Sequence, residues 1–163
     1  ADKLGLDHAG MYKTITTVGK SGGYYVFVVP IDDEIDFKKA AKAAGEKSIE
    51  MLHLKDLTKV TGYIRGGCTS IGMKKQYPTF IHEAAKEQDK ITVSGGRLGL
   101  QITLSPDDLC RAAKAEYADT YNAIVIIELK QRNNRDGKNY FNRRQTNRKT
   151  PYRTLRGLTS QKS

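Results

Sequence analysis

Two stretches between residues 62 and 102, GYIRGGCTSIGMKK (residues 62–75) and KITVSGGRLGLQI (residues 90–102), each contain a pair of adjacent glycines. Each pair lies beside a short β-prone run, where glycine permits a positive φ and brings bare backbone N–H groups close to a ligand. Lys74, Lys75 and Arg97 accompany the two loops. The pattern predicts a pocket for an anionic ligand, recognised largely by backbone donors. The alternative is two ordinary hairpin turns with solvated charges, because paired glycines are common in turns.

Helix start and stop signals flank these loops. They predict helices over 37–44, over 55–61 and from 106 to about 117. Asp36 can cap the first helix, which Gly45 ends, and Gly62 stops the second. The third begins with Ser105 as the cap and Pro106 at the first helical position, followed by acids at the positive end of the helix dipole.

Short strands are predicted between the helices. They cover residues 11–18, 24–31, 48–52, 79–82, 91–93 and 99–104. The first two are joined by a turn at 21–23 and should form a hairpin, with the continuous apolar run 24–31 buried. Strands and helices follow one another without a strict βαβ repeat, which indicates an α+β fold with a mixed sheet.

The positive charge is concentrated near the end of the chain. The 163 residues include 28 Lys and Arg and 18 Asp and Glu, for a net charge of +10. Residues 130–163 hold eleven of the basic residues and one acid, so residues 1–129 are neutral overall. Such a run attracts nucleic acid or an anionic membrane surface without sequence preference. We expect a domain over residues 1–120 and a basic extension over 121–163 that is disordered when alone.

Several classes of protein are excluded by composition. The apolar runs are too short to cross a bilayer, and the polar start does not resemble a signal peptide. Two cysteines, Cys68 and Cys110, do not make a disulfide framework, so we expect a reduced, cytoplasmic protein. The three histidines have no metal-ligand spacing, and we expect neither a metal nor another cofactor.

Lys13 is the first candidate for chemistry. Strand alternation places it on one face with Met11 and Ile15. A lysine there either extends to the rim of the sheet, which is the commoner case, or is held in a cleft where it meets an anion or an ester oxygen.

A nucleophile with a base and an orienting group is not visible in the sequence. Cys68 has no histidine partner nearby, and a cysteine of this kind is most often a small packed residue. An enzyme built on this chain would therefore rely on backbone stabilisation of an oxyanion and a positioned charge. The candidate donor loops contain Gly66, Gly67, Gly95 and Gly96, unless these glycines serve only chain geometry.

These residues resemble a known family. The segments that carry the resemblance are YKT (12–14), VVPID (28–32), KKAAKAAG (38–45), TGYIRGGCTSIGMKK (61–75), PTFI (78–81) and KITVSGGRLGLQI with SPDDL (90–109). Through them, residues 1–119 are similar to the YbaK/EbsC group of aminoacyl-tRNA deacylases, whose typical members remove cysteine mischarged onto proline tRNA. The resemblance implies a relation to the editing domain of bacterial prolyl-tRNA synthetases, and a mixed sheet with flanking helices that curls toward a barrel.

The resemblance also implies roles for particular residues. The key lysine of the family's aromatic-lysine-threonine motif falls on Lys13, and the first glycine of its G-G-x-S-P loop falls on Gly66, which would hold the reacting end of the substrate. Ser94, in the V-S-G-G segment, would line the site. The other expected substrate contacts are Tyr12, Gly67, Thr69, Gly95, Gly96 and Gln101, and the expected RNA contacts are Lys74, Lys75 and Arg97.

The family is thought to use the substrate's own groups, such as a cysteine thiol that attacks its own ester. A thiol held next to an activated carbonyl has a large effective molarity, which fits a chain without a triad. The chain departs from the family in three places. The S-P of the loop reads Thr69-Ser70, which removes a stiffening proline; about 30 residues at the family's start have no counterpart; and residues 121–163 match nothing in it.

These observations predict a trans-editing deacylase that releases cysteine from mischarged tRNA. Its partner would be the tRNA, with prolyl-tRNA synthetase as a further candidate and no membrane. A deacylase for another small amino acid such as alanine is the nearest alternative. The alternative from a different class is a non-catalytic RNA-binding module in which a truncated core no longer catalyses.

Overall fold

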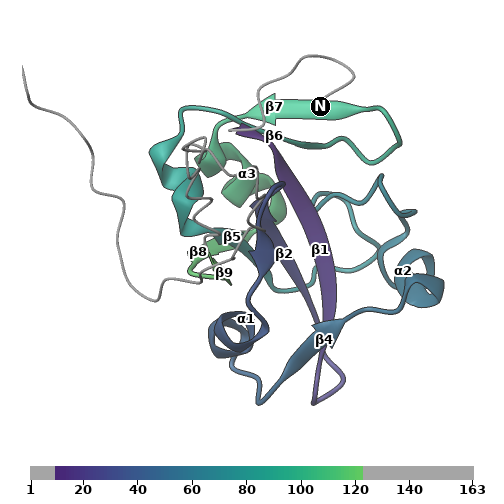
Figure 1. Cartoon of the computed structure of the whole chain (residues 1–163). Coiled ribbons are helices and arrows are strands. Elements are labelled where there is room, and N and C mark those ends of the chain that lie inside the picture. The colour runs from purple at the N-terminus through teal and green to yellow at the C-terminus, as the bar shows by residue number, and fades with distance from the viewer. Residues whose placement is uncertain (1–9, 123–163) are drawn as a thin grey trace, which may run out of the picture. The chain divides into compact units, whose positions relative to one another are not determined.

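The computed structural model describes residues 10–122, which form an α+β fold around a five-stranded mixed sheet (Figure 1). The strands lie in the order β4-β1-β2-β5-β8. Their bounds are Tyr12–Gly19 for β1, Tyr24–Pro30 for β2, Ile49–Met51 for β4, Thr79–His82 for β5 and Ala115–Ala118 for β8. β1 is antiparallel to β2 and to β4, whereas β5 is parallel to both β2 and β8. The predicted mixed α+β fold is confirmed.

Two short ladders complete the described strands. β6 (Ile91–Ser94) and β7 (Gln101–Leu104) form an antiparallel hairpin, and β3 (Glu34–Ile35) pairs with β9 (Tyr121–Asn122). A single parallel bridge from Met11 to Thr92 links β6 to the start of β1. The five-stranded order ends at β4 on one side and at β8 on the other, so the described strands form an open sheet. The predicted curl toward a barrel is not confirmed.

α1 covers Phe37–Ala44, α2 Leu54–Thr61 and α3 Pro106–Ala113, and a 3₁₀ helix covers Glu83–Glu87. α1 begins and ends at its predicted caps, α2 ends at the predicted Gly62, and α3 begins at its predicted cap. Asp36 accepts hydrogen bonds from the N–H groups of Lys38 and Lys39, and Gly45 ends α1 with a φ of 70°. The Ser105 hydroxyl caps α3 through the N–H of Asp108 at 3.1 Å.

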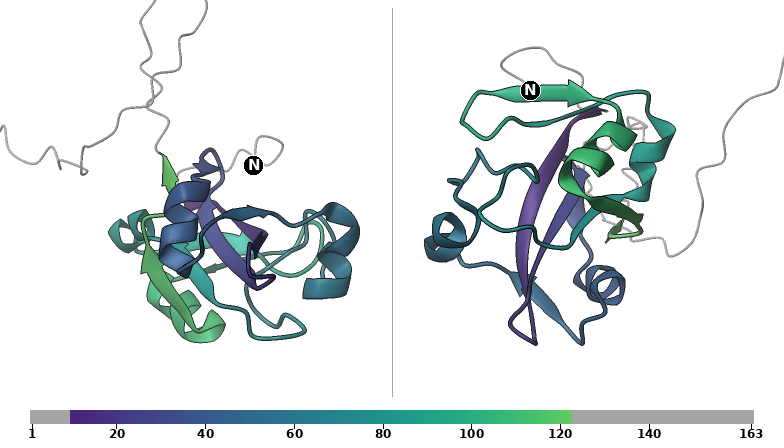
Figure 2. Two further views of the ribbon diagram at one scale, coloured as in Figure 1. Left: turned by 90° about the horizontal axis from the view of Figure 1, so that it is seen from below. Right: turned by 180° about the vertical axis from the view of Figure 1, so that it is seen from behind.

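The sheet separates two hydrophobic clusters, with α1 and α3 on opposite faces (Figures 1 and 2). On the α1 face the buried residues are Phe27, Val29, Ala40, Ala41, Ile49 and Phe80. On the α3 face they are Tyr12, Val28, Ile81, Ala85, Ile91, Val93, Leu109 and Ala113. Neighbouring residues of β2 divide between the clusters, as the alternation of a strand buried on both faces requires.

One predicted element is wrong. The third helix does not reach Tyr117: it ends at Ala113, and Lys114 adopts a left-handed conformation with a φ of 50°. The following residues form β8, which adds to the sheet in parallel beside β5. The last predicted strand is also shorter than expected, because β7 begins at Gln101 and not at residue 99.

The predicted basic extension falls almost wholly on residues 123–163, outside the described residues. Within residues 10–122, the helices are too short to serve as membrane spans.

Candidate functional site

The two paired-glycine loops lie against each other. A β-carbon built at Gly66 would lie 2.8 Å from Leu98 Cδ2, and one at Gly67 would lie 3.2 Å from Arg97 Cα. A β-carbon at Gly96 would lie 3.1 Å from the Tyr63 ring. Gly66 and Gly96 also have positive φ values of 83° and 95°, which side chains rarely adopt. Glycine is therefore required here for the close approach of one loop to the other.

Hydrogen bonds within the 62–75 loop hold its shape. The Tyr63 hydroxyl donates to the Ile71 carbonyl at 2.6 Å, across the loop. The Gly67 N–H donates to the Ile64 carbonyl at 3.1 Å, and the Lys74 N–H donates to the Thr61 carbonyl at 3.2 Å. This loop joins α2 to β5, so the alternative interpretation as a hairpin turn does not apply to it.

The second loop, residues 95–100, is the turn of the β6–β7 hairpin. The Gly95 N–H donates to the Leu100 carbonyl at 2.8 Å, and the Leu100 N–H donates to the Arg97 carbonyl at 3.1 Å. The Ser94 hydroxyl accepts from the Gly96 N–H at 3.3 Å. For this loop the hairpin interpretation is correct, although its glycines also contact the other loop.

Side-chain hydroxyls gather where the 62–75 loop packs on β1. The hydroxyl cluster, as we call it, consists of Thr14, Thr16, Thr69 and Ser70. Thr16 Oγ1 lies 3.8 Å from the Cys68 thiol, and Thr69 and Ser70 are only 3% and 5% exposed. Strand alternation and register place Thr14 on the same face of β1 as Thr16.

Three hydroxyls of this cluster lack a protein partner. Among residues 10–122, the buried oxygens without a hydrogen-bond partner are Thr14 Oγ1, Thr69 Oγ1 and Ser70 Oγ. A buried polar group without a partner costs about 1–3 kcal/mol. Three such groups, on β1 and on the loop that packs against it, are unusual in a packed core and favour a site that receives a polar ligand group.

The Cys68 thiol is a packed group in this structure. Burial raises its pKa, and hydrogen bonds from Thr16 and Thr61 oppose that rise only in part. A thiol with a raised pKa is protonated at neutral pH and is a poor nucleophile. The interpretation of Cys68 as a small packed residue fits its surroundings better than a catalytic role does.

Lys13 does not lie on the same face of β1 as the glycine loops. It pairs with Val29, whose side chain belongs to the α1-face cluster, whereas Cys68 of the 62–75 loop contacts Thr16 on the α3 face. The Lys13 ammonium donates to the Ile31 carbonyl at 3.0 Å.

Lys13 and Thr14 nevertheless share an unpaired edge. On the side away from β2, the described partners of β1 are Thr92, at Met11, and β4, from Thr17 onward. Between these two points the edge of β1 is not covered by another strand of residues 10–122. A ligand at this edge could meet Lys13 from one face and Thr14 from the other.

The remaining predicted contacts are placed as follows. Tyr12, a predicted substrate contact, is 4% exposed and packs in the α3-face cluster, so its side chain is part of the hydrophobic core. Gln101 pairs with Ser94 across the β6–β7 hairpin and is exposed. Lys74, Lys75 and Arg97 are exposed on the loops, and the Lys74 ammonium donates to the Lys59 carbonyl at 3.3 Å.

Three residues of the site do not follow from the sequence patterns above. Thr14 stands next to the predicted lysine, and the alternation of β1 is the signal that could place it near the loops. Ser70 stands out in the sequence only as a departure from a proline. Tyr63, whose hydroxyl ties the loop together, has no signal beyond its position beside the glycines.

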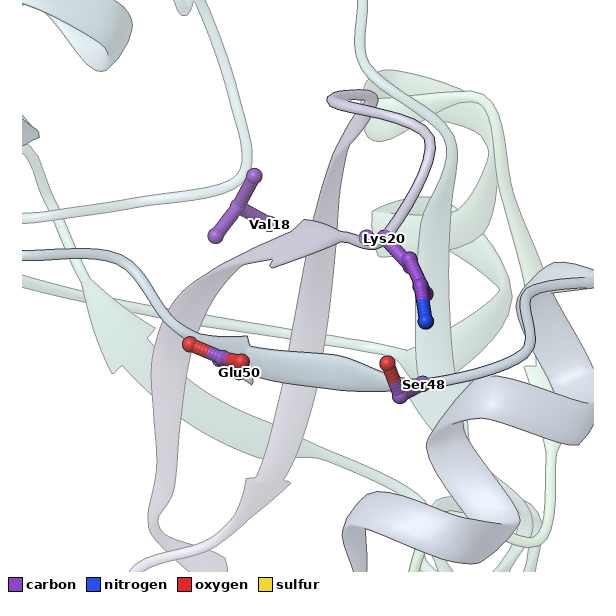
Figure 3. A pocket seen from close by; sticks show the side chains of 5 residues that line it. Val18, Lys20, Ser48 and Glu50 are labelled. Carbon is purple, nitrogen blue, oxygen red and sulfur yellow. The ribbon is translucent and has the colours of Figure 1, made fainter.

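Two open depressions on the surface of the described residues lie elsewhere. One of about 370 Å³ is lined by Val18, Gly19, Lys20, Ser48 and Glu50 (Figure 3). Another of about 410 Å³ is lined by Lys86, Gln88, Asp89, Ser105, Pro106, Asp107 and Tyr117. Neither contains a predicted site residue or an unpartnered hydroxyl, so the loops remain the better candidate. The described residues include no group of three or more His, Cys, Asp or Glu arranged to hold a metal ion.

Comparisons with known proteins concern the domain as a whole. The family model described as an aminoacyl-tRNA editing domain matches residues 1–112. A protein of Enterococcus faecalis, provisionally named Cys-tRNA(Pro)/Cys-tRNA(Cys) deacylase EbsC, is 48% identical over 119 residues, which are 73% of each chain.

Solved structures show the same fold. A crystal structure provisionally described as a trans-editing enzyme for prolyl tRNA synthetase has a TM-score of 0.66 and 22% identity, over 74% of this chain and 76% of that chain. A hypothetical protein has a TM-score of 0.68 and 24% identity, over 74% of this chain and 80% of that chain. At these identities the likeness is one of fold alone.

Proposed function

This chain belongs to the aminoacyl-tRNA editing domain family, and on that premise we propose that it is a deacylase that releases cysteine from mischarged tRNA. The observation that carries the proposal is the meeting of two glycine loops over hydroxyls that lack protein partners, beside the unpaired edge of β1. A neutral, hydroxyl-lined site suits a small amino acid whose ammonium and ester oxygens need hydrogen-bond partners.

Among the four predicted backbone donors, we propose Gly66. The N–H groups of Gly67 and Gly95 donate to carbonyls within the loops, and that of Gly96 donates to the Ser94 hydroxyl. An N–H already used in a turn is a poorer donor for a developing oxyanion. Gly66 also stands where the two loops meet, because its α-carbon faces Leu98 of the other loop.

The chemistry we propose comes from the substrate. The cysteine thiol attacks its own ester carbonyl, so that a carbon–sulfur bond forms and the carbon–oxygen bond to the ribose breaks. The thiol proton ends on the departing ribose oxygen, and the product is a cyclic thioester of cysteine that water opens. The protein supplies orientation and polar stabilisation, which suits a site without a nucleophile–base pair.

A series of esters tests this function. Cysteine, serine and 2-aminobutyrate on the same proline tRNA have similar sizes, but only cysteine carries a thiol. The purified chain at sub-stoichiometric amounts should release cysteine over many turnovers and the other two at least tenfold more slowly. The rate on cysteine should rise with pH toward about 8.5, as the substrate thiol ionises.

Equal rates on all three esters would remove the thiol from the mechanism while leaving a deacylase. Alanine on the same tRNA is measured alongside these three esters, and faster release of alanine than of cysteine would support the alternative amino acid. No release of any ester, with tRNA binding retained, would support the non-catalytic RNA-binding module. The tRNA is the partner we propose, and a complex with prolyl-tRNA synthetase stays a prediction.

A further inference from the structure

An exposed aliphatic surface covers the outer side of the two glycine loops. Its residues are Ile64, Leu98, Leu100 and Ile102, which are 52%, 66%, 44% and 39% exposed. We call these four residues the aliphatic platform. Large apolar side chains that are open to solvent and gathered on neighbouring segments commonly mark a binding surface.

The platform is continuous with the core. Along β7, Leu104 packs against the α3-face cluster, and Ile102 pairs with the buried Val93. Leu100 precedes Ile102 by two residues. Its Cγ lies 2.6 Å from the position that a β-carbon on Gly95 would take. Leu98 then lies over Gly66, which is two residues from Ile64. An apolar stripe therefore runs from the core out to the junction of the loops.

The chain segments that carry the platform residues contain basic residues and no acidic ones. Residues 62–82 and 90–106 contain five basic residues and no Asp or Glu. The basic residues are Arg65, Lys74, Lys75, Lys90 and Arg97. Because residues 1–129 are neutral overall, the rest of that region carries a net charge of −5. The two segments that contain the loops thus carry positive charge, while the other residues of 1–129 sum to a net negative charge.

We propose that the aliphatic platform and its arginines bind the unpaired nucleotides at the 3′ end of the tRNA, which carry the aminoacyl ester to the loops. This inference rests on the proposed function. Unpaired nucleotides expose apolar base faces beside closely spaced phosphates, and both are matched here, by the aliphatic side chains and by Arg65 and Arg97. A duplex hides its bases and would use only the charges.

The same charges argue against a second copy of this chain as the occupant. Two platforms brought together would bring together Arg65 and Arg97 of each copy, on segments that contain no acids to balance them. Self-association is therefore an outcome that the test must detect, and it is not the one we expect.

The test measures the full chain's affinity for a short single-stranded RNA that ends in CCA, and for a blunt duplex of the same sequence. The double variant Leu98→Ser/Leu100→Ser should weaken single-strand binding roughly tenfold and leave duplex binding and the salt slope unchanged. The double variant Arg65→Gln/Arg97→Gln should weaken both and flatten the salt slope by roughly 0.7 for each phosphate that is no longer neutralised.

Met51→Ser/Leu54→Ser is the matched control, since these side chains are 50% and 57% exposed on β4 and α2. It should change neither affinity. Leu98→Ala alone, a milder change, should give a smaller loss in the same direction if the double variant unfolds. An unchanged ratio of single-strand to duplex affinity in the Leu98 variants would overturn the proposal. So would a dimer that these variants dissociate without any change in RNA binding.

RNA binding is measured without an ester, so this result is independent of catalysis. If the chain does not release cysteine but shows the expected preference for single-stranded RNA, the proposal for the platform is supported and the proposed deacylase function is contradicted. If the Leu98 variants release cysteine at the normal rate at limiting tRNA, the proposal for the platform is contradicted and the deacylase function is supported.

Discussion

Gly66 shows how one glycine can serve two purposes that a sequence does not separate. Its positive φ and its contact with Leu98 demand glycine for loop packing alone, while the proposed function needs its backbone beside the ester. The atom that a new β-carbon would meet is the end of a flexible side chain. Leu98 could therefore move aside, and the two purposes can be separated by mutation.

Gly66→Ala should lose at least tenfold in deacylation and about 1–2 kcal/mol in stability, because of the left-handed backbone. If the substrate approaches this backbone, Gly66→Ala/Leu98→Ala should stay at least tenfold less active than Leu98→Ala alone, which accounts for any loss of RNA binding through Leu98. Recovery in the double variant would mean that the glycine only makes room for Leu98. The control is Gly45→Ala, which has a φ of 70° and open space around it, and which should cost stability alone. Initial rates and urea unfolding supply both quantities.

Lys13 and Thr14 test whether the site spans the edge of β1. Lys13→Ala should abolish deacylation and change stability by no more than about 1 kcal/mol, since it removes one hydrogen bond to Ile31. Thr14→Val should lower activity at least tenfold without loss of stability, because its hydroxyl has no partner among the described residues. If both variants lose activity, the site lies at the edge of β1. An active Lys13→Ala with an inactive Thr14→Val would confine it to the face of the loops.

At the scale of elements, local signals predicted most of the fold. The capping residues Asp36 and Ser105, and the hairpin joining β1 to β2, are predictable because they depend on near neighbours in sequence. β8 is not, since its sequence AEYA favours a helix and becomes a strand only through pairing with β5. The glycine pairs can be read directly from the sequence, whereas the contact between the two loops depends on the folded chain. The face of Lys13 likewise depends on the register with Val29.

His82 joins the end of β5 to the segment before β9. Its Nδ1 accepts a hydrogen bond from the Thr120 N–H at 3.1 Å, and burial lowers its pKa from 6.5 to about 4. At a pH between these two pKa values, His82 is protonated in the unfolded chain and neutral in the folded chain. Stability should therefore fall as the pH drops through this window, by at most about 1.4 kcal/mol for each pH unit.

His82→Asn keeps an acceptor but does not titrate, and it should show a shallower loss of stability between pH 6.5 and pH 4. Above pH 7 the pH dependence of the two proteins should be the same. The measurement is urea unfolding across the pH range. Parallel curves for both proteins would show that His82 ionises equally in the folded and unfolded chains.

For the whole molecule, the uneven distribution of charge predicts that affinity for tRNA and preference for the ester depend on different parts of the chain. Residues 130–163 carry the net +10 of the chain, while residues 1–129 are neutral overall. Deleting 130–163 should weaken tRNA binding and flatten its dependence on salt, by roughly 0.7 to 0.9 in log–log slope for each phosphate released from these residues. The preference for cysteine over other esters should not change, because the proposed site lies within residues 10–122. An unchanged salt slope would show that these residues do not anchor RNA.

The parallel pairs at the centre of the sheet have a consequence for how the protein is made. β5 pairs with β2 and β8, and these partners lie far from it along the chain. Strand pairs of this kind form slowly, because a long loop must close before the pairing can stabilise it. During translation, β5 keeps one bare edge until Ala118 has left the ribosome. If translation pauses before that point, the exposed edge of β5 is available for pairing with other nascent chains. The synthesis of the last few residues of β8 therefore determines when this edge is protected from aggregation.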